Sequence, residues 1–174
     1  MKRLAPALLV AAGLLAGRVA AADDKAPAEL DALRWYEGSW TCQTFDYDAK
    51  HVKTAAGAAT VHVQRALANH WYEVVMDVAP GKELPAGWHT HEFKGYDPKA
   101  KKWIQIALVS EAGGWAHLES AGLMKDTMVW TLVGEPKSTA RGVMHRISDT
   151  EYEHTEEENG AATWSKHCTK AATR

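Results

Sequence analysis

The sequence predicts an all-β protein, a closed up-and-down antiparallel barrel of about ten strands. Ten segments of 7 to 10 residues alternate between two faces, whereas helical periodicity of useful length is absent. Turn signals such as Asp97-Pro98, Gly113-Gly114 and Asn159-Gly160 separate these segments. Short sequential strands with tight turns favour a meander that closes on itself, because closure removes exposed sheet edges. A two-sheet sandwich is the alternative architecture.

The expected elements follow one another along the whole chain after its first residues. Residues 28–33 can form one or two helical turns before the first strand. The ten expected strands are residues 38–47, 59–67, 70–78, 88–96, 103–110, 114–120, 127–133, 140–148, 151–158 and 162–170. No linker or repeat divides them, so residues 23–174 are expected to form a single β-barrel domain.

Residues 1–22 have the pattern of a secretory signal peptide. Lys2 and Arg3 precede an apolar run over residues 4–15, and small residues lead to an expected cleavage site after Ala22. A membrane anchor is the competing interpretation, but the apolar run is shorter than the roughly 20 residues that span a bilayer. We therefore expect a periplasmic or secreted protein with no membrane contact after processing.

The net charge and the absence of known catalytic motifs limit the classes of function. Removing residues 1–22 leaves 17 basic and 22 acidic residues, a formal charge of −5, which makes nucleic acid an unfavourable partner. The sequence has no Gly-x-Ser-x-Gly elbow and no glycine-rich phosphate loop. It therefore offers no catalytic residues, and an enzyme of unknown type remains an alternative without support.

Cys42 and Cys168 are the only cysteines, and they lie on the first and last expected strands. In a closed meander these strands are neighbours, and an oxidising compartment favours a disulfide between them. Two unpaired buried thiols are the alternative. If the bridge forms, alternation places Trp164 and Lys166 on the same face as Cys168, and His167 on the opposite face.

The alternation also predicts which residues face the barrel lumen. Glu151, Glu153 and Glu157 must be wet, so His154 and its face are expected to point inward. The same argument applied to the other strands gives a predicted ligand-binding set: Tyr72, Met76, His89, His91, Phe93, Met128, Trp130, His145 and His154.

Four of these histidines raise the alternative of a metal or haem site. His89 and His91 share a strand face, and a two-residue turn at Asp149-Thr150 would place His145 opposite His154. The two pairs are expected on nearly opposite walls of the barrel, so one zinc ion could join them only in a narrow lumen. Polar groups in the wall of a partly wet cavity are the favoured interpretation.

Short motifs along the chain resemble those of known families. Gly38-Ser39-Trp40 resembles the Gly-x-Trp opening of calycin (lipocalin-like) barrels, and Phe93-Lys94-Gly95-Tyr96-Asp97-Pro98 with the closing Cys168 resembles an exported bacterial family of unknown function. This resemblance covers residues 33–170 and implies a ten-stranded barrel without established catalytic residues. More distantly the chain is similar to haem-binding nitrobindin barrels, which use a late-strand histidine. Here His167 is the late-strand candidate, and Cys42 occupies the position of a motif glycine.

The sequence therefore predicts an exported barrel that binds a small apolar or aromatic molecule in its lumen. The ligand would be desolvated against aromatic and aliphatic walls such as Trp130, while the inward histidines supply a few polar contacts. The alternative functions are binding of zinc or haem and an unidentified enzymatic activity.

Overall fold

The computed structural model describes residues 25–81, 86–110 and 113–172, so the expected signal peptide lies outside the described residues. A short 3-10 helix, η1 (Ala28–Tyr36), precedes the sheet. The strands are β1 (Gly38–Tyr47), β2 (Lys53–Ala66), β3 (Trp71–Val78), β4 (Trp88–Asp97), β5 (Lys102–Val109), β6 (Gly114–Ser120), β7 (Leu123–Met124), β8 (Thr127–Leu132), β9 (Arg141–Ser148), β10 (Glu151–Glu158) and β11 (Ala161–Lys170). The all-β prediction is confirmed.

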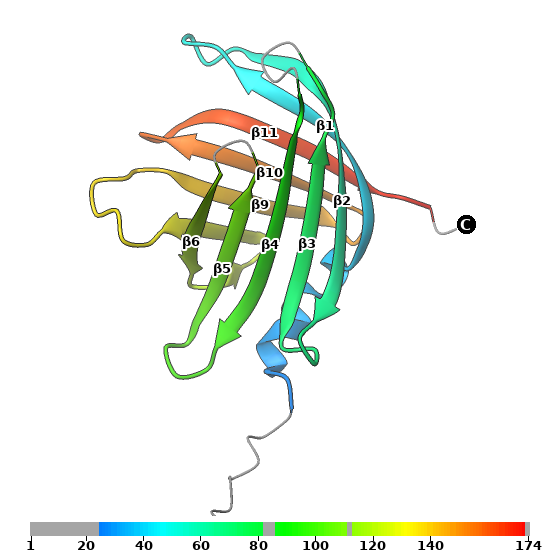
Figure 1. Ribbon diagram of the computed structural model, residues 1–174, viewed down its shortest axis with the longest axis vertical. Helices are drawn as coiled ribbons and strands as arrows, with labels where there is room; N and C mark the ends of the chain where they lie inside the picture. The colour runs from blue at the N-terminus through cyan, green and yellow to red at the C-terminus, as the bar shows by residue number, and fades with distance from the viewer. Residues whose placement is uncertain (1–24, 82–85, 111–112, 173–174) are drawn as a thin grey trace, which may run out of the picture.

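The strands form one closed antiparallel barrel. Their order is β6-β5-β4-β3-β2-β1-β11-β10-β9-β8-β7, and a short pairing of β6 with β8 completes the ring. Ten strands make up the barrel and β7 is an additional two-residue strand on β8. Figure 1 shows β3, β4 and β5 in front of β9, β10 and β11, which run behind them at a steep angle. Such tilting is required when a sheet curls into a barrel.

The strand boundaries follow the sequence pattern closely. The expected strands 38–47, 114–120 and 151–158 match β1, β6 and β10 residue for residue. Two differences have local causes. β2 begins at Lys53 rather than at residue 59, because its first half is rich in alanine and glycine and carries little alternation. β7 has only two residues, too few to show any period.

The first and last strands are joined both by backbone pairing and covalently. β1 pairs with β11, and Cys42 and Cys168 are directly opposite each other in that register. The two cysteines form a disulfide, as predicted, and both are buried. A disulfide of this kind is typical of proteins outside the cytoplasm.

One end of the lumen is filled by η1 and an aromatic cluster. Leu30 and Leu33 of η1 have no exposed surface, and the ring of Trp40 meets that of Tyr152 edge to face at 4.9 Å. Tyr36 packs against both rings. Figure 1 places η1 at the end of the barrel where β3 begins and β4 ends. Burial of each of these large side chains contributes about 2 to 3 kcal/mol, so this half of the barrel is a packed core.

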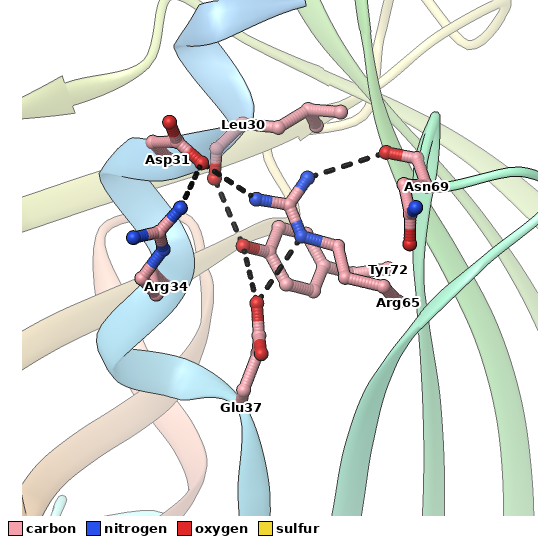
Figure 2. A network of polar contacts seen from close by, with 7 residues as sticks. All are labelled: Leu30, Asp31, Arg34, Glu37, Arg65, Asn69 and Tyr72. Carbon is pink, nitrogen blue, oxygen red and sulfur yellow. Dashed lines mark hydrogen bonds and ion pairs between the residues drawn. The ribbon is translucent and has the colours of Figure 1, made fainter. Parts of the chain in front are cut away.

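A polar clamp holds η1 against β2 and β3 (Figure 2). Arg65 donates to Glu37 at 3.1 Å and to Asp31 at 3.0 Å, and its guanidinium lies over the ring of Tyr72 at 4.3 Å. The Tyr72 hydroxyl donates to the backbone carbonyl of Leu30 at 2.9 Å. These bonds give η1 a fixed position on the end of the barrel, which its short length could not provide by itself.

Across the described segments, no helix combines the length and the hydropathy that a membrane crossing would require.

Replacing both Cys42 and Cys168 with serine is expected to lower the free energy of unfolding by about 4 to 5 kcal/mol, because the bridge closes a loop of 126 residues in the unfolded chain. Denaturant titration of the oxidised protein and the double variant measures this difference. The reduced wild-type protein is the matched control and should resemble the variant. Equal midpoints for oxidised and reduced protein would contradict the prediction.

Arg65→Lys is expected to cost about 1 to 2 kcal/mol of unfolding free energy, because an ammonium cannot reproduce the forked contacts of the guanidinium. Arg34→Lys is the matched control. Arg34 binds the same Asp31 at 3.1 Å, but its side chain is 72% exposed, and such surface pairs contribute little. Thermal and denaturant unfolding of both variants measures the two losses of unfolding free energy. Equal losses for Arg65→Lys and Arg34→Lys would contradict the role given to the clamp.

Candidate functional site

The half of the lumen away from η1 contains a cavity of about 300 Å³. It exists because small residues occupy inward positions on neighbouring strands. Ala107 of β5 lies directly opposite Ala116 of β6, and Gly142 of β9 lies beside β10. The rim includes Arg141, which is exposed, so the cavity reaches the surface. Its size is at the lower end of the range for small-molecule sites, roughly 300 to 1,000 Å³.

Apolar side chains form most of the cavity wall. The rings of Trp88 and Trp164 meet at 5.4 Å on one side, and Leu118 of β6 and Leu132 of β8 lie opposite each other at the closing seam. Met76 of β3 also lines the space. A flat or aliphatic molecule would therefore leave water for a largely apolar surface.

Glu92 and Gln105 line this cavity and bind a buried cation behind its wall. Lys94 is 3% exposed, and its ammonium donates to the carboxylate of Glu92 at 2.5 Å and to the side-chain carbonyl of Gln105 at 2.6 Å. Burial by itself would raise the pKa of Glu92, but the cations of Lys94 and Lys166 lower it below its usual value. Glu92 therefore stays ionised, and Lys94 has two oxygen acceptors.

Lys166 of β11 is the second buried lysine, and its surroundings differ. It is 6% exposed and lines the cavity, and the acceptor within hydrogen-bond distance of its ammonium is the thioether sulfur of Met76, at 3.0 Å. Burial lowers the pKa of Lys166 to about 8, with Lys94 acting in the same direction and the carboxylates of Glu92 and Glu156 opposing it. Sulfur is a weak acceptor, so this ammonium can bind an oxygen atom of a ligand.

His154 and Glu156 form a pair on the β10 wall. Their side chains are 2.6 Å apart, and His154 lies opposite Lys166 in the register of β10 and β11. A Cβ atom at Gly142 would come within 3.2 Å of the His154 ring, so glycine leaves room for the pair. Burial would raise the pKa of Glu156, but His154 lowers it below its usual value.

Two further polar atoms in the cavity wall have no hydrogen-bond partner among the described residues. They are the indole nitrogen of Trp88 and the hydroxyl of Thr90. Buried polar groups are normally satisfied, and those that are not often mark a site that receives a ligand or water. Together with Lys166 they give the cavity three donors.

The structure divides the predicted ligand-binding set. Met76 and His154 line the cavity. Tyr72, Met128 and Trp130 point inward as predicted but are fully buried in the packed half, where Trp130 lies under the Lys94 ammonium at 5.1 Å. The facing predicted for His89, His91, Phe93 and His145 is wrong.

The face of β4 is the reverse of the prediction. His89 binds Asp77 and His91 binds Glu73, both at 2.7 Å on the outer surface, and Phe93 stacks on His91 there. The polar residues Thr90, Glu92 and Lys94 point inward instead. Alternation separated the two faces of β4 correctly, but the more apolar face was expected to point inward. That expectation is wrong because the barrel interior is itself polar at this strand. A short turn between β3 and β4 would have fixed which of their residues pair and therefore which face of β4 points inward. The connection between these strands is too long to do so.

His145 faces outward because of a bulge. Ser148 lies opposite Glu151, as a two-residue turn requires, but the next pair is Arg146 with Tyr152, so Ile147 is the extra residue. A one-residue shift moves side chains to the other face. His145 therefore lies opposite Glu153 and contacts Thr127 at 3.1 Å on the outside.

These positions bear on the metal and haem alternatives. Of the four histidines, only His154 faces the lumen, and the described residues contain no group of three or more potential ligands suited to a metal ion. His167 faces outward and binds Glu151 at 2.9 Å. His167, the late-strand candidate, therefore does not face the lumen in which a haem would lie.

Comparison with known proteins supports the fold alone. No family model matches the chain, and no curated protein sequence matches it. A solved structure does match. The crystal structure of Rv2717c from M. tuberculosis has a TM-score of 0.60 and 10% sequence identity, and the match covers 85% of this chain and all of that one. At this identity the similarity establishes a shared barrel architecture, and the named bacterial and nitrobindin families remain resemblances.

Sequence reasoning missed Glu92, Thr90 and Lys166 as site residues. Glu92 and Thr90 lie on the face of β4 opposite to His89, His91 and Phe93, which were the residues expected to point inward. Lys166 could have been found, because the disulfide prediction already placed it on the inner face with Cys168. A lysine at an inward strand position is rare enough to indicate a functional site.

The unfolding free energy of the wild type minus that of Lys166→Met is expected to depend on pH. It should increase by about 2 kcal/mol when the pH is raised from about 7 to about 9.5. The folded-state pKa of Lys166 is about 8 against 10.5 for the ordinary side chain, so between these values the unfolded chain binds more protons. Glu92, Lys94, His154 and Glu156, which face Lys166, are present in both proteins. Urea unfolding across this range measures the difference, and a flat or falling difference would disprove the lowered pKa.

Proposed function

We propose that the protein binds a small apolar or aromatic molecule in the open half of the barrel, and that the molecule carries an oxygen acceptor. The observation that supports this is an apolar cavity of about 300 Å³ combined with a buried ammonium, that of Lys166, whose acceptor within the described chain is a thioether sulfur. The barrel fold is consistent with such a role.

The two parts of the site would have different tasks. The tryptophans, Leu118 and Leu132 supply the burial of apolar surface that gives most of the affinity. Lys166, Thr90 and the indole of Trp88 supply orientation, because each can donate to one oxygen atom. A carboxylate or carbonyl group is therefore the favoured polar end, and a hydrocarbon without it would bind less tightly.

Charge in the cavity also favours an acceptor near Lys166. The Lys94 cation is paired with Glu92, and the Glu156 carboxylate accepts a hydrogen bond from His154. Lys166 makes no direct ion pair with any of the described residues. A ligand carboxylate would give the Lys166 ammonium a direct ionic partner, and buried charges are stable when they are paired.

The experiment compares 2-naphthoate with naphthalene. Binding of either should change the fluorescence of Trp88 and Trp164, which line the cavity. Lys166→Met is expected to weaken 2-naphthoate binding by about ten- to a hundredfold, the usual effect of losing a hydrogen bond to a charged group. It should leave naphthalene binding nearly unchanged.

Ala107→Phe fills the cavity and should abolish binding of both compounds, while His91→Ala on the outer surface is the matched control and should change neither. Circular dichroism verifies that each variant is folded. Binding that persists in the folded Ala107→Phe variant would place the ligand elsewhere and overturn the proposal.

A further inference from the structure

The two buried lysines of the lumen differ in a way that has chemical consequences. Lys94 is held by a carboxylate oxygen and an amide oxygen, at 2.5 Å and 2.6 Å, and it does not line the cavity. Lys166 lines the cavity, and its nitrogen contacts the sulfur of Met76 at 3.0 Å rather than an oxygen of the described chain. An amine with a weak acceptor and open space before it can turn toward a ligand.

We propose that Lys166 captures aldehydes, or similarly reactive apolar carbonyl compounds, as a covalent imine inside the barrel. This inference rests on the proposed function, because the carbonyl compound must first enter the cavity. Its apolar part would lie against the tryptophans, and its carbonyl carbon would meet the Lys166 nitrogen.

The reaction balances without any further reagent. The neutral Lys166 amine attacks the carbonyl carbon and forms a carbinolamine, with the proton moving from nitrogen to oxygen. Loss of the hydroxyl group as water then gives the protonated imine: R–CHO + Lys166–NH3⁺ → R–CH=NH⁺–Lys166 + H2O. A carbon–nitrogen double bond replaces the carbon–oxygen double bond, and one positive charge is present before and after.

The surroundings of Lys166 support each step. Burial favours the neutral amine, which is the nucleophilic form. The ammonium releases its proton to water at the open rim of the cavity, and the hydroxyl group takes up a proton as it leaves as water. Glu92, which stays ionised, is close enough to stabilise the positive charge of the protonated imine.

The apolar walls also oppose hydrolysis. An imine reverts when water reaches its carbon, and a ligand that fills a cavity of about 300 Å³ leaves little room for water. The exposed lysines of the chain lack such protection, so they form imines that revert rapidly. The expected selectivity for Lys166 therefore comes from both its amine and its enclosure.

The test uses 2-naphthaldehyde with sodium cyanoborohydride, which reduces an imine to a stable amine. Peptide mass spectrometry then locates the added mass. The expected result is an adduct on Lys166 at least tenfold above that on Lys94 or on any exposed lysine. Lys166→Met and Lys166→Arg should both lose it. Lys102→Met, which removes an exposed lysine paired with Glu119, is the matched control and should retain it.

A second measurement separates this inference from the proposed function. Binding of 2-naphthalenemethanol, which has the same ring system and cannot form an imine, reports on the cavity alone. Binding of this alcohol without preferential labelling of Lys166 would overturn the imine and leave the proposed function in place. Failure of the alcohol to bind would overturn both. Equal labelling in wild type and Lys166→Arg would also overturn the imine.

Discussion

The pairing of β1 with β11 is the constraint on which the rest of the structure depends. It brings the two ends of the strand sequence together and converts a curved sheet into a closed wall, with Cys42 and Cys168 bonded at facing positions. A closed wall gives the inner face its low exposure to water. Without it Glu92, Lys94 and Lys166 would be ordinary solvated charges, and the lowered pKa of Lys166 would have no cause.

Side-chain size then divides the enclosed space into two halves. Near η1 the inner positions carry Trp40, Trp130 and Tyr152, which fill the lumen completely. At the other end alanine and glycine occupy the corresponding positions, as at Ala107 and Gly142, and the space remains. The packed half contributes most of the hydrophobic stabilisation. The hollow half can therefore accommodate polar and small residues that a core would not tolerate.

The polar groups of the hollow half are better explained by function than by stability. Removing charges from water is costly, and even a well-made buried ion pair often adds little to folding. The pair of Lys94 with Glu92 at least satisfies both of its members. Lys166 is not satisfied in this way, because the described chain offers its ammonium a sulfur atom as acceptor. A side chain kept in such a position, beside an accessible cavity, is a candidate for contact with a ligand.

The sequence by itself determined the architecture: the ten barrel strands, their order, the disulfide and the inward facing of Tyr72, Met76, Met128, Trp130 and His154. These follow from period-two alternation and from the location of the cysteines on the end strands, which are local or nearly local signals. The tertiary structure alone decided the site. Which face of β4 points inward depends on how β4 pairs with β3 across a long connection. The outward direction of His145 depends on a single bulge at Ile147. Whether an inward polar residue is wet or buried depends on what lies opposite it across the barrel, and no alternation along one strand contains that information.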